Sequence, residues 1–208
     1  MEVFFANLFS SFLDEYNVKK KQYMIALTFV VVGLLIGIIL IFAYDDLELM
    51  LEISNKNYMS FMHGTADLSS IFLENFRWII IADIIVILFS LSGITYALGL
   101  SYIAYQSALV SITIGAMIST FGFTGILNCL FLILPFNILN VIMLTILIVS
   151  LHNFFVDNKK SGVSYFSCKR DKFAYIRICM IVLIQILLCL IMSYFVPYLL
   201  KSLVIVNF

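Results

Sequence analysis

The chain has 208 residues, of which 63% are hydrophobic and 12% are charged, and its mean hydropathy is +1.13. Soluble domains are about 45–50% apolar and about 25% charged, so this composition excludes a soluble globular or a disordered protein. The twelve Lys and Arg balance the twelve Asp and Glu. Nucleic-acid binding needs a basic excess, so no nucleic-acid partner is expected. The composition indicates an all-α, polytopic membrane helical bundle whose first partner is the lipid bilayer.

The N-terminal part of the chain predicts two successive helices. Residues 1–22 carry aromatic side chains at helical spacing, interleaved with polar residues, at Phe5, Phe9, Phe12 and Tyr16. This pattern is typical of an amphipathic helix that lies at the membrane surface. Residues 23–43 are an uncharged apolar run of 21 residues. About 20 apolar residues span a bilayer, so this run predicts the first transmembrane helix.

The rest of the chain alternates between polar and apolar segments. Residues 44–77 are acidic, with hydrophobic residues at helical intervals, which predicts short amphipathic helices broken around His63 and Gly64. Four further apolar segments predict transmembrane helices over residues 78–98, 100–121, 126–155 and 173–200. A polar, basic link covers residues 156–172. The whole chain is therefore predicted to be one membrane domain with about five transmembrane helices.

The distribution of Lys and Arg predicts the orientation of these helices. Nine of the twelve basic residues fall on one predicted side, at Lys19, Lys20, Lys21, Lys159, Lys160, Lys169, Arg170, Lys172 and Arg177. Short cytoplasmic loops carry the excess of Lys and Arg. The N-terminus and the link 156–172 are therefore predicted to be cytoplasmic. The acidic segment 44–77 and the C-terminus are predicted to be extracytoplasmic.

Polar residues within the apolar segments are the candidate functional positions. Asp83 is the one acidic residue inside a predicted span. It is either part of a proton or cation relay or an interfacial, helix-pairing residue close to the start of its helix. Pro135 interrupts the predicted helix 126–155, and Asn137 and Asn140 lie on one face of that helix. They form either a substrate site at a broken helix or a kink that packs against neighbouring helices.

Two further sets of residues were weighed for function. Gly33 and Gly37 form a GxxxG pattern, which lets helix backbones approach closely, either within this protein or against another one. The cysteines and histidines show no spacing typical of a metal site or of catalysis; they are Cys129, Cys168, Cys179, Cys189, His63 and His152. The sequence therefore predicts no catalytic residue, no metal, no cofactor and no enzyme activity.

The order of several short motifs resembles the stage II sporulation protein M family. The glycine pair Gly33 and Gly37 is similar to that of the family's first span, and the stretch 72–76, which contains Asn75, is similar to the entry of the second. The glycine turn at residues 121–127, followed by Leu-Pro-x-Asn at residues 134–137, is similar to the fourth span. Val196-Pro197 and Lys201 are similar to the family's ending.

This resemblance implies a non-enzymatic scaffold of the bacterial inner membrane. Members of the sporulation branch recruit and localise peptidoglycan hydrolases during septum remodelling and engulfment. The implied partners are an amidase and a lytic transglycosylase, and a second copy of the chain is a further candidate partner. Partner contact is expected at residues 44–77. The residues alone also leave a second function open, that of a permease subunit or small-solute transporter that uses the broken helix 126–155.

Overall fold

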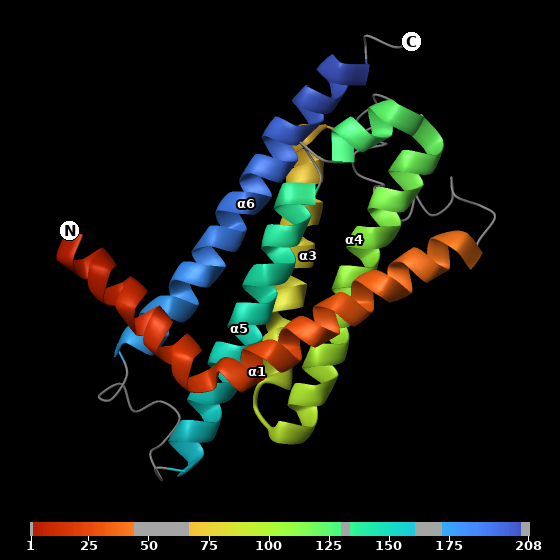
Figure 1. The fold of residues 1–208 in the computed structure, drawn as a ribbon. Coiled ribbons are helices and arrows are strands. Elements are labelled where there is room, and N and C mark those ends of the chain that lie inside the picture. The colour runs from red at the N-terminus through yellow and green to blue at the C-terminus, as the bar shows by residue number, and fades with distance from the viewer. Residues whose placement is uncertain (1, 44–66, 130–133, 161–171, 205–208) are drawn as a thin grey trace.

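A computed structural model describes residues 2–43, 67–129, 134–160 and 172–204. These residues form α1 (Glu2–Ala43), α3 (Leu68–Phe89), α4 (Gly93–Asn128), α5 (Leu134–Lys160) and α6 (Lys172–Val204) (Figure 1). The described ranges contain no strand, which confirms the predicted all-α class. The helices of this part of the chain bury an apolar core between them, and α5 contacts all four other helices.

Four stretches of the described helices are long and apolar enough to cross a membrane. They are Lys19–Ala43 in α1, Gly93–Ser119 in α4, Phe136–Val156 in α5 and Tyr175–Phe195 in α6. α3 is not among them, because any stretch of it long enough to cross a bilayer contains Glu74, Arg77 and Asp83. The membrane character of the chain follows from these four stretches, and a fifth span formed by α3 stays a prediction.

Successive helices of the bundle run in alternating directions. α3 and α6 are antiparallel, because Asn75 of α3 is bonded to Ser193 of α6 while Asp83 faces Gln185. Figure 1 shows α3 and α5 descending while α4 and α6 ascend. The turn between α3 and α4 therefore lies at the lower end of the bundle in this view. The ends of α5 and α6 that flank residues 161–171 lie at the same lower end.

α1 crosses the outside of the bundle and packs most extensively on α4 (Figure 1). The backbone carbonyl of Ala104 faces Gly33, and that of Ala108 faces Gly37. The chain therefore runs in the same direction in both helices where they cross. A break at Lys19, with φ −110° and ψ 18°, divides α1. This break falls within residues 1–22, near the end of the predicted amphipathic helix and four residues before the predicted first span, residues 23–43.

The turn between the second and third apolar segments lies earlier than predicted. α3 ends at Phe89 and α4 begins at Gly93, whereas the sequence predicted helices over residues 78–98 and 100–121. The side chain of Ser92 accepts a hydrogen bond from the backbone N–H of Thr95, and the Thr95 hydroxyl accepts one from Ser92 N–H. This reciprocal capping starts α4. Gly99, which was expected at the joint, is a buried position inside α4.

The predicted helix 126–155 is divided between two helices of the structure. α4 continues to Asn128, past a break at Gly122, and α5 begins at Leu134. Pro135 therefore lies in the first turn of α5 rather than at the middle of a kinked helix. A proline is tolerated there, because the first N–H groups of a helix have no partner within it. The predicted break around His63 and Gly64 lies outside the described residues.

Candidate functional site

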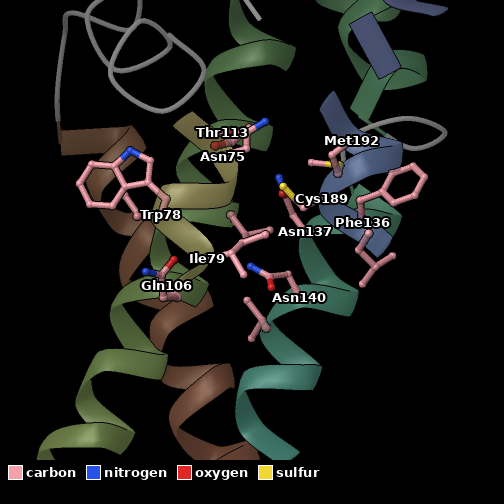
Figure 2. Close-up of a pocket in the computed structure, with 14 residues that line it drawn as sticks. Asn75, Trp78, Ile79, Gln106, Thr113, Phe136, Asn137, Asn140, Cys189 and Met192 are labelled. Atoms are coloured by element: carbon pink, nitrogen blue, oxygen red, sulfur yellow. The ribbon is translucent and has the colours of Figure 1, made fainter. Parts of the chain in front are cut away.

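A cavity of about 240 Å³ lies between α3, α4, α5 and α6 (Figure 2). Each of these helices contributes side chains to its wall. The polar residues of the wall are Asn75, Gln106, Thr113, Asn137, Asn140 and Cys189. The apolar residues are Trp78, Ile79, Leu109, Val110, Phe136, Val141, Leu188 and Met192. The cavity therefore combines an apolar surface with four carboxamide groups inside a membrane bundle.

Three of the site residues predicted from the sequence meet in this cavity. Asn75 reaches it from α3, and Asn137 and Asn140 reach it from the first two turns of α5. Figure 2 shows Asn137 and Asn140 pointing from α5 toward α3 and α4. Their spacing of three residues places them on one face of the helix, as the sequence predicted. Pro135, two residues before Asn137, fixes the backbone of the turn that positions them.

Two of the cavity's carboxamides are held by neighbouring side chains. Asn75 Nδ2 donates a hydrogen bond to Ser193 Oγ at 3.0 Å, which links α3 to α6. Gln106 Nε2 donates to the hydroxyl oxygen of Tyr102 at 2.8 Å, one turn earlier in α4. The amides of Asn137 and Asn140 make no hydrogen bond to any residue that the structure describes. These two amides are therefore available to a ligand, together with the Gln106 oxygen.

Asp83 lies in the interior of the bundle and not near the start of a helix. Because α3 begins at Leu68, Asp83 is 15 residues into the helix, and its side chain is only 8% exposed. It faces Gln185 of α6, which is fully buried. Asp83 Oδ1 and both amide atoms of Gln185 nevertheless lack a partner at hydrogen-bonding distance and angle. The structure thus places Asp83 at a contact between α3 and α6, whereas its predicted position near the start of a helix is wrong; a relay role stays a prediction.

A separate polar cluster lies nearer the lower end of the bundle. His152 Nδ1 donates to the backbone carbonyl oxygen of Ser90 at 3.2 Å. The Tyr96 ring stacks on the His152 ring, with their centroids 4.1 Å apart. These contacts tie the end of α3 to α4 and α5. The partners of His152 are therefore the Ser90 carbonyl and the Tyr96 ring, both of which hold helices together. Among the described residues, no three His, Cys, Asp or Glu side chains gather in a way that could hold a metal ion.

Gly33 and Gly37 lie at a contact within the chain. A Cβ added at Gly33 would overlap the backbone carbonyl of Ala104, and one at Gly37 would overlap that of Ala108. The atoms that such a Cβ would meet first belong to the backbone of α4, which cannot move aside as a flexible side chain could. Of the two arrangements that the GxxxG pattern allowed, the structure therefore shows packing of α1 against α4.

Sequence reasoning missed several residues of the cavity and its surroundings. Gln106, Thr113 and Gln185 are polar residues in apolar segments, the same signal that identified Asp83 and Asn140. Two of them lie in the interior of the bundle, since Thr113 is 4% exposed and Gln185 is fully buried. A systematic list of uncharged polar side chains in the apolar segments would have found them. Which of them share one cavity follows only from the packing of four helices.

Comparison with known proteins adds no relative. No protein-family model, no curated protein and no solved structure matches this chain. Its function is therefore argued from its own residues and their arrangement.

Proposed function

We propose that this chain is a bacterial inner-membrane protein with five transmembrane helices, a cytoplasmic N-terminus and an extracytoplasmic C-terminus. Two observations support the proposal. Helices α1, α4 and α6 run in one direction and α3 and α5 in the other, as an alternating five-span chain requires. Lys159 and Lys160 of α5 and Lys172 of α6 also come at the lower end of the bundle. Basic residues at that end favour a cytoplasmic location for it.

We further propose that the protein is a non-enzymatic scaffold that recruits peptidoglycan hydrolases during septum remodelling and engulfment. One observation carries this proposal: residues from the motifs similar to the stage II sporulation protein M family occupy positions that need those residue types. Gly33 and Gly37 sit against the backbone of α4, and Gly122 has a positive φ of 57°. Asn75 and Asn137 line one cavity although they are far apart in the sequence. These residues hold the helix bundle together, which supports a scaffold role like that of the family whose motifs they resemble.

The acidic segment 44–77 is the proposed contact surface for the hydrolases. It holds six of the twelve acidic residues of the chain, at Asp45, Asp46, Glu48, Glu52, Asp67 and Glu74. The structure describes its last part, where α3 exposes Leu73 and Glu74. Trp78, one turn later, is 60% exposed. Protein interfaces combine an apolar centre with a polar rim, and exposed Leu73 and Trp78 beside Glu74 match that arrangement.

Co-purification of the tagged full-length chain from membranes tests the scaffold proposal. We expect the wild type to recover an amidase and a lytic transglycosylase. Neutralising the segment with Asp45→Asn, Asp46→Asn, Glu48→Gln and Glu52→Gln should reduce that recovery, because the charges that attract the partner are lost. The matched control, Asp14→Asn with Glu15→Gln, removes acidic charge from the predicted cytoplasmic helix and should leave recovery unchanged. Absence of any cell-wall hydrolase with the wild type would contradict the proposal.

A transport function is the second candidate, and the cavity favours it. Transporters bind their substrates near the middle of the bilayer, at helices whose regular structure is interrupted. Here α5 begins at Leu134, three residues before Asn137, and Asp83 is buried in the same bundle. Flux of small solutes into vesicles that contain the purified protein tests this function. Flux that is present in the wild type and lost in Asn137→Ala and Asp83→Asn would favour a transporter over a scaffold.

A further inference from the structure

We propose that the cavity between α3, α4, α5 and α6 binds one small, uncharged solute that carries both hydrogen-bond donors and acceptors, of the amide or urea class. The inference concerns binding alone. It deepens the transport candidate by naming the class of solute, and it also holds if the protein binds the solute without moving it across the membrane.

The charge of the wall determines the charge of the ligand. Among the residues that the structure describes, none that lines the cavity is an Asp, Glu, Lys or Arg. An ion that entered would lose its hydration shell and gain no opposite charge, which is strongly unfavourable in an apolar surrounding. The buried acid Asp83 does not line the cavity. The wall therefore selects against acetate-like anions and guanidinium-like cations.

The hydrogen-bonding groups of the wall determine the kind of polar ligand. Each of the Asn137 and Asn140 amides offers an N–H₂ group that donates and an oxygen that accepts, and neither is bonded within the described part of the bundle. The Nε2 group of Gln106 donates a hydrogen bond to the Tyr102 hydroxyl, and the Oε1 atom of Gln106 can accept one from a ligand. The side chains of Asn137 and Asn140 are half-buried, so a ligand in the cavity reaches these groups. A ligand with paired donors and acceptors, as in an amide, satisfies both kinds of group at once.

The size of the cavity sets an upper limit on the ligand, and its apolar surface favours an organic solute. The volume of about 240 Å³ equals that of roughly eight water molecules in the liquid. Pockets for drug-sized ligands start at about 300 Å³. Ile79, Val110 and Val141 contribute apolar wall between the amides, which gives a small organic solute an advantage over water alone. A short amide fits both parts of this wall.

The cavity contains two natural reporters of its occupancy. Cys189 lies in its wall and is only 1% exposed. Trp78, the single tryptophan of the chain, lies in the same wall. A variant with Cys129→Ala, Cys168→Ala and Cys179→Ala leaves Cys189 as the only thiol of the full-length protein. Its rate of modification by methyl methanethiosulfonate, a small uncharged reagent, can be measured in lipid vesicles.

The experiment compares uncharged solutes with charged ones of the same shape. We expect acetamide and urea to slow the modification of Cys189, whereas acetate and guanidinium at equal concentration do not. In the unmodified protein, acetamide and urea should also change Trp78 fluorescence along a saturating curve. This second measurement needs no amino-acid substitution, so it tests the proposal even if a variant fails to fold.

Substitutions assign the effect to the proposed amides. Asn137→Leu and Asn140→Leu should each raise the acetamide concentration for half-protection roughly 2- to 10-fold, as expected for one lost hydrogen bond. Gln22→Leu removes a carboxamide from α1, outside the cavity wall, and should leave protection unchanged. The proposal is overturned if neither solute affects Cys189 or Trp78, or if acetate and guanidinium act as strongly as their uncharged counterparts. Protection without solute flux would retain the binding site and remove the transport function.

Discussion

Small residues set the distance between α1 and α4. Gly33 faces the carbonyl of Ala104, and Gly37 faces that of Ala108, so each glycine of one helix meets an alanine of the other. Within lipid, such close approach supplies the van der Waals contacts that hold helices together, because apolar side chains gain little by leaving the bilayer. The fixed position of α1 on the bundle therefore depends on the absence of a side chain at these two positions.

We expect Gly33→Ala to destabilise the protein by about 1–3 kcal/mol, the usual cost of forcing an added carbon into a packed interior. The measurement is the thermal stability of the detergent-purified protein. Gly93→Ala is the matched control, because nothing lies within 4 Å of a Cβ added at Gly93. Equal stability of the two variants would contradict the close contact of α1 and α4.

Asp83 shows why a polar residue in a span can be important without a relay. Its carboxyl group interacts with the Gln185 side chain, yet Asp83 Oδ1 and both amide atoms of Gln185 lack a partner with the distance and angle of a good hydrogen bond. Unsatisfied buried polar atoms cost about 1–3 kcal/mol each. A carboxamide at position 83 could exchange two hydrogen bonds with Gln185, which a carboxylate cannot do because it only accepts.

We therefore expect Asp83→Asn to raise thermal stability. The gain should disappear when Gln185→Leu is added, because the new hydrogen bonds need that amide. Glu74→Gln, a change of the same type at an exposed position of α3, is the control and should have little effect. A loss of stability in Asp83→Asn would show that the carboxylate itself has a partner that this arrangement does not provide.

The polar residues of the apolar segments show which part of the site can be predicted from the sequence. A proline, an acid and two asparagines in apolar segments are visible without any structure, and Asn137 and Asn140 share a face as their spacing predicted. The partners of these residues could not be predicted. Gln106 and Gln185 come from other helices, and which faces of four helices meet depends on packing across the whole bundle.

At the scale of elements, α4 is the helix with a built-in break. Gly122 has φ 57° and ψ −129°, a backbone conformation that residues with a side chain rarely adopt. The main chain changes direction there and continues to Asn128 (Figure 1). This break leads the chain toward α5, whose first turns carry the two asparagines of the cavity. A glycine that does not itself line the cavity therefore helps to position its wall.

Gly122→Ala should destabilise the protein by about 1–3 kcal/mol through backbone strain, because the added Cβ itself would meet open space. The variant should also weaken protection of Cys189 by acetamide. The Gly93→Ala variant again serves as the control for loss of a glycine in α4. A stable Gly122→Ala protein with normal protection would mean that the break does not position the cavity.

Element boundaries were predicted less well than the elements themselves, and the reason is physical. The joint between α3 and α4 carries no charged residue, so hydropathy cannot distinguish it from the spans on either side. Its true signal is the pair Ser92 and Thr95, which caps α4. The bounds 78–98 and 100–121 place this joint too late in the chain, because Gly99 lies inside α4, where it lets Ile148 approach. Pro135 predicts a kink because, in an apolar sequence, the first turn of a helix and its interior look alike.

The proposed five-span arrangement of the whole molecule depends on α3 crossing the membrane. Its length of 22 residues is sufficient for a span, but Glu74, Arg77 and Asp83 lower its apolar character. Its neighbours compensate for part of this: Asp83 is covered by α6, whereas Glu74 and Arg77 lie in the half of α3 nearer the upper end. The zero net charge of the chain is therefore the sum of an acidic segment before α3 and basic residues around the other end of the bundle.

The most direct test is the accessibility of single cysteines to a membrane-impermeant thiol reagent applied to intact cells. In a chain whose four cysteines are replaced by alanine, Ser54→Cys reports on the segment before α3 and Leu91→Cys on the turn after it. If α3 spans the membrane with the N-terminus inside, position 54 is labelled in intact cells and position 91 only after permeabilisation. Labelling of both positions in intact cells, or of neither, would contradict a five-span bundle.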